Sequence, residues 1–131
     1  MRTYNQSTQR IAQMLGADMA YLGTRLIACT ESLAVAGYKQ MLIEAGAEDI
    51  VLSAALTGIP ANWLKASLMA AGYDAEGLKA KAQIDLGRPE DAAARWRDVW
   101  SAGQGVGEVH AIEPLAQIID DLAGDYQRAG L

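Results

Sequence analysis

Residues 16–25 read Gly16-Ala17-Asp18-Met19-Ala20-Tyr21-Leu22-Gly23-Thr24-Arg25, and the prediction for the rest of the chain starts from this stretch. Gly16 can adopt the left-handed conformation that ends a helix over residues 7–15. The apolar residues 19–22 have strand length and no helical periodicity, which predicts a short β-strand. Gly23 and Thr24 then predict a turn whose free N–H groups bind a phosphate, with charge from Arg25. A turn without a ligand explains the same residues.

Length and composition limit the function classes. The chain has 131 residues, the size of one ordinary domain, whereas a complete (β/α)8 barrel needs about 250. A net charge of −5 argues against a nucleic-acid partner, because phosphate neutralisation needs clustered Lys and Arg. The single cysteine, Cys29, excludes a disulfide within the chain. The chain has neither an apolar run of membrane-span length nor the apolar core of a secretion signal, so we expect no membrane partner and a cytoplasmic location.

Helices dominate the predicted secondary structure. We expect five or six helices and at most two or three short strands. Thr30 or Ser32 is the expected cap of a helix that reaches about Ala45, and Pro60 is expected to open a helix that Gly72 closes. The last helix places Leu115, Ile118, Ile119 and Leu122 on its inner face. The expected helices cover residues 7–15, about 32–45, 61–71, 74–81, 89–102 and 114–128, with a strand at 50–52 in addition to 19–22.

Other residues that could carry chemistry have simpler structural explanations. The alternating Gly103, Gly105 and Gly107 follow a helix, whereas a dinucleotide-binding fingerprint follows a strand. His110 has no His or Cys partner at metal-ligand spacing, so we expect no metal site and an exposed histidine. Tryptophans 63, 96 and 100 are expected in the core, with Trp96 and Trp100 stacked one helical turn apart, and Cys29 is expected to be a small packed residue.

Three blocks of sequence carry a resemblance to a known family. They are residues 16–25, residues 57–65 (Thr-Gly-Ile-Pro-Ala-Asn-Trp-Leu-Lys) and residues 96–107 (Trp-Arg-Asp-Val-Trp-Ser-Ala-Gly-Gln-Gly-Val-Gly). Together they resemble the flavin-dependent nitronate monooxygenases, formerly called 2-nitropropane dioxygenases, over about residues 11–131. One departure is Leu26, which stands where the family usually has Phe after its Gly-Thr-Arg motif.

The resemblance implies a fold and a set of ligand-binding residues. The fold is α/β: the C-terminal part of a (β/α)8 TIM barrel, comprising its last strand and the following helices, so that residues 1–131 form one partial and mainly helical domain. The implied cofactor is flavin mononucleotide (FMN). The residues that would hold its phosphate are Tyr21, Leu22, Gly23 and Thr24, and those that would line the flavin are Ser101, Gly103 and Gln104.

The resemblance also implies a reaction for a larger parent protein. That parent would oxidise a small alkyl nitronate with molecular oxygen and release a carbonyl compound and nitrite. The family's catalytic histidine lies upstream of the matching residues, so we expect no catalytic residue here and no turnover by the isolated chain. An unpaired strand at residues 19–22 would also promote self-association.

Two alternatives remain open. Residues 16–25 also resemble the flavin-dependent enoyl-acyl-carrier-protein reductases, while residues 96–107 favour the monooxygenases. A non-catalytic helical protein that keeps these blocks for packing, and works by binding a partner, is the second alternative.

Overall fold

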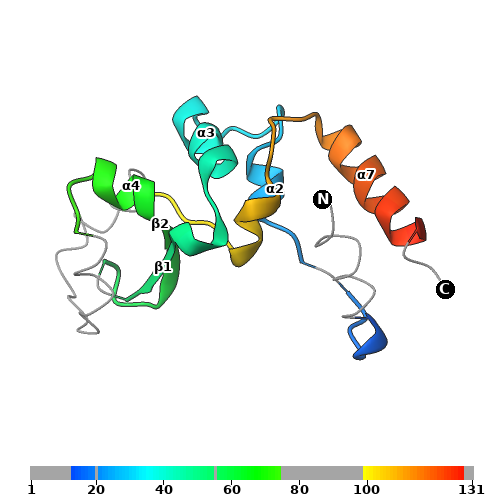
Figure 1. Ribbon diagram of the computed structural model, residues 1–131, viewed down its shortest axis with the longest axis horizontal. Coiled ribbons are helices and arrows are strands. Elements are labelled where there is room, and N and C mark those ends of the chain that lie inside the picture. Colours follow the sequence, from blue (N-terminus) through cyan, green and yellow to red (C-terminus); the bar gives the residue numbers. More distant parts are fainter. Residues whose placement is uncertain (1–12, 20, 55, 75–98, 129–131) are drawn as a thin grey trace.

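The structure, a computed structural model, describes residues 13–19, 21–54, 56–74 and 99–128 (Figure 1). This part of the chain contains both helices and strands, which confirms the α/β class. Outside it lie Trp96, residues 75–81 of the helix expected at 74–81, residues 89–98 of the helix expected at 89–102, and most of the helix expected at 7–15. The elements are α2 (Thr24–Ile27), α3 (Ala36–Glu44), η1 (Ala47–Asp49), β1 (Ile50–Ser53), β2 (Ala61–Leu64), α4 (Lys65–Ala70), η2 (Gln104–Glu108) and α7 (Leu115–Arg128).

Strands β1 and β2 form an antiparallel pair in which Ile50 faces Leu64 and Ser53 faces Ala61. The prediction of β1 is confirmed, but the prediction of one helix over 61–71 is wrong in its first turn. The chain stays extended after Pro60, because pairing with β1 satisfies its backbone and lets the fully buried Trp63 donate from Nε1 to the Ser53 carbonyl, 3.1 Å away. The helix begins only at Lys65 and ends, as predicted, before the left-handed Gly72.

The strand predicted at residues 19–22 is absent from the described part of this segment. Met19, Tyr21 and Leu22 lie in irregular backbone, with relative exposures of 91%, 101% and 37%. The available strand β1 pairs with β2 instead, and an apolar run without a partner strand has no ladder to join. The left-handed conformation predicted for Gly16 is confirmed by its φ of 95°.

Helix α3 begins later than predicted, after Val35 rather than after Thr30 or Ser32. The Thr30 N–H donates to the Glu113 carbonyl at 2.9 Å, and this bond holds the chain away from a helical path. Buried Lys39, on α3, donates from Nζ to the carbonyls of Cys29 and Ser32 at 2.7 and 2.9 Å. The segment before α3 is therefore an ordered loop fastened by the helix itself.

The C-terminal helix α7 buries a narrower face than predicted. Ile118 and Leu122 are buried as expected and pack with Cys29 and Leu26. Leu115 and Ile119, which were also predicted to point inward, are 38% and 51% exposed. The reason is that α7 packs against the α2 region along a single stripe rather than entering a broad core.

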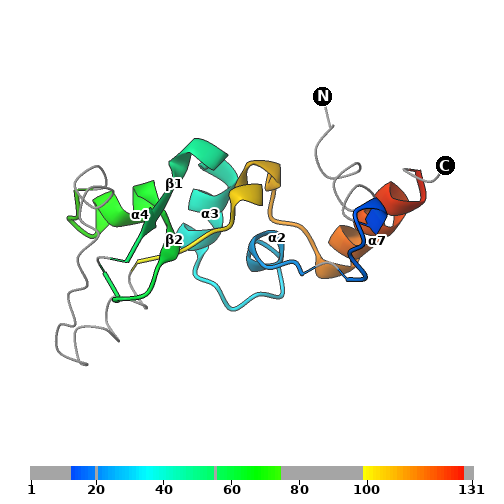
Figure 2. The ribbon, with the colours of Figure 1, turned by 90° about the horizontal axis from the view of Figure 1, so that it is seen from below.

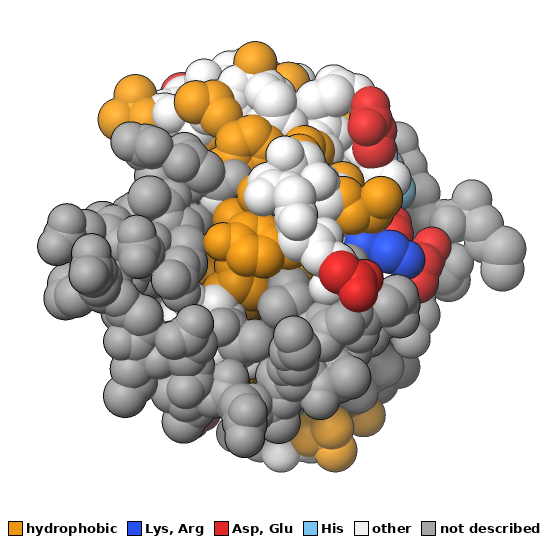
Figure 3. Space-filling model, turned by 90° about the vertical axis from the view of Figure 1, so that its left-hand side faces the viewer, with side chains coloured by type: hydrophobic (Ala, Val, Ile, Leu, Met, Phe, Trp, Pro, Cys, Tyr) orange, Lys and Arg blue, Asp and Glu red, His pale blue; other side chains and the backbone are white. Residues whose placement is uncertain are grey.

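The described elements are spread along the long axis of the molecule. In Figures 1 and 2, β1, β2 and α4 lie at one end, α2 and α3 lie in the middle, and α7 lies at the other end. From the β1–β2 end, hydrophobic side chains gather in the middle of the face and charged ones lie toward its edge (Figure 3). No helix among the described residues has both the length and the hydrophobicity to cross a membrane.

Candidate functional site

Gly23 and Thr24 form the turn that opens α2. The Gly23 carbonyl accepts hydrogen bonds from the N–H groups of Leu26 and Ile27, at 3.0 and 3.2 Å. Gly23 has a φ of −129°, which residues other than glycine can also adopt. A β-carbon built on Gly23 meets no atom within 4 Å. The space beside the turn is therefore open, and the protein fold itself does not require glycine there.

The Thr24 side chain connects two of the three sequence blocks. Its Oγ1 accepts a hydrogen bond from the Gly103 N–H at 2.8 Å, across 79 residues of sequence. A β-carbon on Gly103 would lie 3.3 Å from the same oxygen, so the close approach favours glycine at this position. Because Oγ1 acts as an acceptor toward Gly103, the hydroxyl hydrogen remains available to a ligand.

The segment from Val99 to Gly103 runs beside β2 instead of continuing a helix. The Trp100 carbonyl accepts from the Leu64 N–H at 2.9 Å, and Ser101 forms a bridge with Trp63. The helix predicted up to residue 102 is therefore wrong at its C-terminal end, because the backbone of Trp100 and Ser101 pairs with β2. The three glycines that follow belong to η2 or its boundary.

Two side chains of neighbouring helices form hydrogen bonds with the segment from Val99 to Gly103. Buried Ser67, on α4, accepts the Trp100 N–H at 2.7 Å. Tyr38, on α3, donates its hydroxyl to the Ser101 carbonyl, and its ring stacks on Trp100 with centroids 5.1 Å apart. Trp100 therefore stacks on Tyr38, while Trp96 lies outside the described residues. Burial raises the pKa of the Tyr38 phenol, and the phenol thus favours its neutral, hydrogen-donating form.

These contacts border an open hollow of about 270 Å³ between α2, β2 and the segment from Val99 to Gly103. Its polar lining residues are Thr24, Asn62 and Ser101, one from each of the three sequence blocks. Among the residues that the structure describes, the lining consists of Thr24, Ile27, Ala61, Asn62, Ser101, Ala102 and Gly103, and none of these is charged.

The structure brings together three of the seven predicted cofactor-binding residues in this hollow: Thr24, Ser101 and Gly103. Tyr21 and Leu22 precede the turn with exposed side chains, and neither lines the hollow. Gly23 adjoins the lining residue Thr24 but is not itself part of the lining. Gln104 is also exposed, at the start of η2. Asn62 was missed, although a polar residue between Ala61 and Trp63 in an otherwise apolar run is a signal that sequence analysis could have used.

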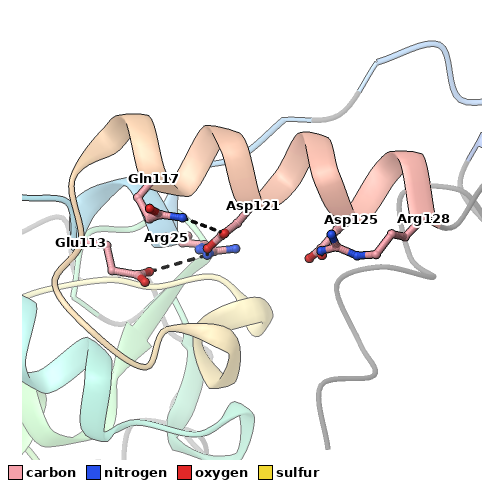
Figure 4. A network of polar contacts seen from close by, with 6 residues as sticks. All are labelled: Arg25, Glu113, Gln117, Asp121, Asp125 and Arg128. Atoms are coloured by element: carbon pink, nitrogen blue, oxygen red, sulfur yellow. Dashed lines mark hydrogen bonds and ion pairs between the residues drawn. The ribbon is translucent and has the colours of Figure 1, made fainter.

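Arg25 does not point its charge into the hollow. Its Nη2 atom lies 3.6 Å from Glu113 Oε2 and 3.4 Å from Asp121 Oδ2, and Gln117 of α7 donates to the other Asp121 oxygen at 2.9 Å (Figure 4). Asp121 thus helps to hold α7 against α2. The positive charge expected beside a phosphate is already paired with carboxylates.

The remaining candidate groups behave as expected where the structure describes them. His110 is exposed, Cys29 is buried, and Trp63 belongs to the core. No group of three or more His, Cys, Asp or Glu side chains in the described ranges is placed to hold a metal ion.

Comparison with known proteins places this hollow in context. The family described as nitronate monooxygenase matches residues 8–125. A curated nitronate monooxygenase from Paraburkholderia phytofirmans is 29% identical over 126 residues, which cover 90% of this chain and 34% of the relative. The chain thus spans about a third of the length of that relative.

Two solved structures of FabK from Thermotoga maritima are also similar. The wild-type structure is 27% identical with a TM-score of 0.64, and the match covers 94% of this chain and 41% of FabK. The structure of its M276A mutant is 28% identical with a TM-score of 0.63, and covers 90% and 37%.

Proposed function

Since this chain belongs to the nitronate monooxygenase family, we propose that it forms the phosphate-binding part of an FMN site in an enzyme that oxidises alkyl nitronates with molecular oxygen. The observation that carries this proposal is the meeting of the three family-like blocks at one hollow. Residues far apart in sequence converge there through the bond from Gly103 N–H to Thr24 Oγ1.

The residues of the hollow fit the phosphate end of FMN. A phosphate needs hydrogen-bond donors and room for its oxygens. The Thr24 hydroxyl hydrogen is such a donor, and the space beside Gly23 is open. Within the described residues, the N–H groups of Thr24 and Arg25 have no protein acceptor. The Arg25 charge is paired with Glu113 and Asp121, so hydrogen bonds from oriented backbone and hydroxyl donors would bind the phosphate in its place.

The chain's own role is binding and orientation. When bound, the flavin supplies the electron-transfer chemistry with oxygen and nitronate. Gly23 and Thr24 would hold the phosphate, together with the backbone of Tyr21 and Leu22, while Ser101, Gly103 and Gln104 would border the flavin. The exposed His110 is not placed to act as the catalytic base, so we propose that the base comes from a part of the larger protein outside this chain.

The proposed architecture follows from the same reasoning. Residues 1–131 would form the C-terminal part of a (β/α)8 barrel whose other units complete the flavin site. We therefore expect no oxygen consumption above the no-protein rate from this chain with FMN and propionate 3-nitronate. The curated relative is a nitronate monooxygenase, which favours nitronate oxidation over enoyl reduction as the parent reaction.

Amide NMR spectra of the chain, recorded during titration with FMN, test the proposed site. The amide signals of Gly23, Thr24 and Gly103 should shift in a saturable way with FMN and should shift far less with riboflavin, which lacks the phosphate. A Thr24→Val variant should weaken this response. Unchanged amide signals at millimolar FMN would contradict the proposal.

A further inference from the structure

We propose that Asn62 is a further binding residue of the hollow, and that its side-chain amide donates hydrogen bonds to a phosphate. This inference rests on the proposed function, because it assigns a role at the same site. It adds a residue from β2 to a site so far composed of the turn of α2 and the segment from Val99 to Gly103.

The first step of the argument is the position of Asn62. It faces Leu52 in the β1–β2 pair and lies directly beside the buried Trp63, so the strand holds its backbone firmly. The residue is half-buried and lines the hollow with Thr24 and Ser101. A polar residue fixed on a strand at this position has little freedom to leave the hollow.

The second step is the state of the Asn62 amide. In the ranges that the structure describes, its side chain makes no hydrogen bond to the protein. A half-buried amide without a partner is unfavourable unless water or a ligand completes it. The Asn62 amide therefore supplies two unused N–H donors beside the unused Thr24 hydroxyl hydrogen.

The third step is the kind of ligand. The described residues of the lining include no carboxylate, which would repel an anion, and no cationic side chain. Neutral donors arranged around open space suit an anion that accepts several hydrogen bonds, such as a phosphate monoester. The hydroxyl-rich chain of a flavin could use the same donors, and riboflavin separates these two sources experimentally.

The test uses an isosteric substitution with a matched control. Asn62→Asp replaces the NH₂ group by a charged oxygen, which accepts hydrogen bonds and repels a phosphate. We expect FMN binding to weaken roughly tenfold or more, since hydrogen bonds to charged groups are the stronger ones. Ala116→Glu adds the same charge on the exposed face of α7, away from the hollow, and should leave the FMN dissociation constant unchanged.

A second measurement needs no variant. The side-chain NH₂ signals of Asn62 in the unmodified chain should shift with FMN and with inorganic phosphate, but not with riboflavin. An equal shift with riboflavin would overturn the phosphate assignment. For the Asn62→Asp variant of the first test, an unchanged indole N–H signal of Trp63 would show that the strand pair is intact, because this group donates to the Ser53 carbonyl of β1.

The results of these experiments distinguish a failure of the Asn62 inference from a failure of the proposed function. If FMN binds and Thr24→Val weakens binding, but the Asn62 signals and the Asn62→Asp variant show no effect, the inference fails and the proposed function stands. If the unmodified chain shows no response to FMN at any of these residues, both fail.

Discussion

At the scale of single residues, a substitution of Gly23 should affect FMN binding much more than it affects folding stability. Because its φ is negative and a β-carbon there meets open space, Gly23→Ala should change the free energy of unfolding by no more than about 0.5 kcal/mol. The same methyl group would occupy the space proposed for phosphate oxygens, so FMN binding should weaken at least tenfold, as measured by titration alongside urea unfolding.

Gly105→Ala is the control for this prediction. Its β-carbon also meets nothing within 4 Å, but Gly105 lies in η2 and not in the turn that opens α2 beside Thr24, so both stability and FMN binding should be retained. Equal FMN affinity in Gly23→Ala and the unmodified chain would show that no phosphate lies beside this turn.

The candidate site could be predicted only where the sequence blocks themselves contain the contact residues. Thr24, Ser101 and Gly103 were predicted and meet at the hollow. The partners of Arg25 could not be predicted, because Asp121 lies 96 residues away and the pairing depends on how α7 docks. Asn62 was missed because it reaches the hollow only when β2 is paired with β1.

At the scale of elements, the start of α7 depends on a carboxylate from a distant loop. Both oxygens of Glu31 accept the Leu115 N–H, at 3.1 and 2.9 Å. This backbone hydrogen bond is the main reason why the pKa of Glu31 lies below its ordinary value of 4.5. A lowered folded-state pKa contributes stability that is present above the unfolded pKa and is lost as pH falls through the folded one.

Hydrogen exchange in the first turn of α7, measured against pH, tests this cap. Glu31→Gln should exchange faster than the unmodified chain at neutral pH. The difference should begin to shrink below about pH 4.5, the unfolded-state pKa, and should disappear once pH has fallen through the lower folded-state pKa. As a control, Glu44→Gln changes an exposed residue at the end of α3 and should leave the exchange rates of the α7 amides unchanged. A difference that persists in acid would show that charge on Glu31 is not what stabilises the turn.

The elements that local sequence could predict are those whose signals are local. The apolar face of α7, the left-handed Gly72 after α4 and the β-branched start of β1 were sufficient on their own. Pairing with β1 extended residues 61–64 against the helix signal of Pro60. Residues 19–22 show the converse, since an apolar run forms a strand only where a partner strand is present.

At the scale of the whole molecule, the described chain leaves an unusual amount of apolar surface uncovered before α2. Met14, Leu15, Met19 and Tyr21 are all largely or fully exposed. The chain also spans only 34% of its curated relative. We propose that the remaining length of the parent covers this surface, which would be consistent with the partial barrel proposed above.

The isolated chain should therefore self-associate through the apolar side chains before α2 rather than through the strand edge first expected there. Several large apolar side chains exposed within one short segment favour association, so we expect dimers or larger species in sedimentation velocity at tens of micromolar. The double substitution Leu15→Lys and Met19→Lys should restore a monomer, because each lysine would have to be desolvated in the contact.

The paired control Leu33→Lys and Ile59→Lys adds the same charge at exposed apolar positions elsewhere and should leave association intact. Equal loss of association in both double variants would attribute it to net charge, and a sharp monomer of the unmodified chain would contradict the role of this surface.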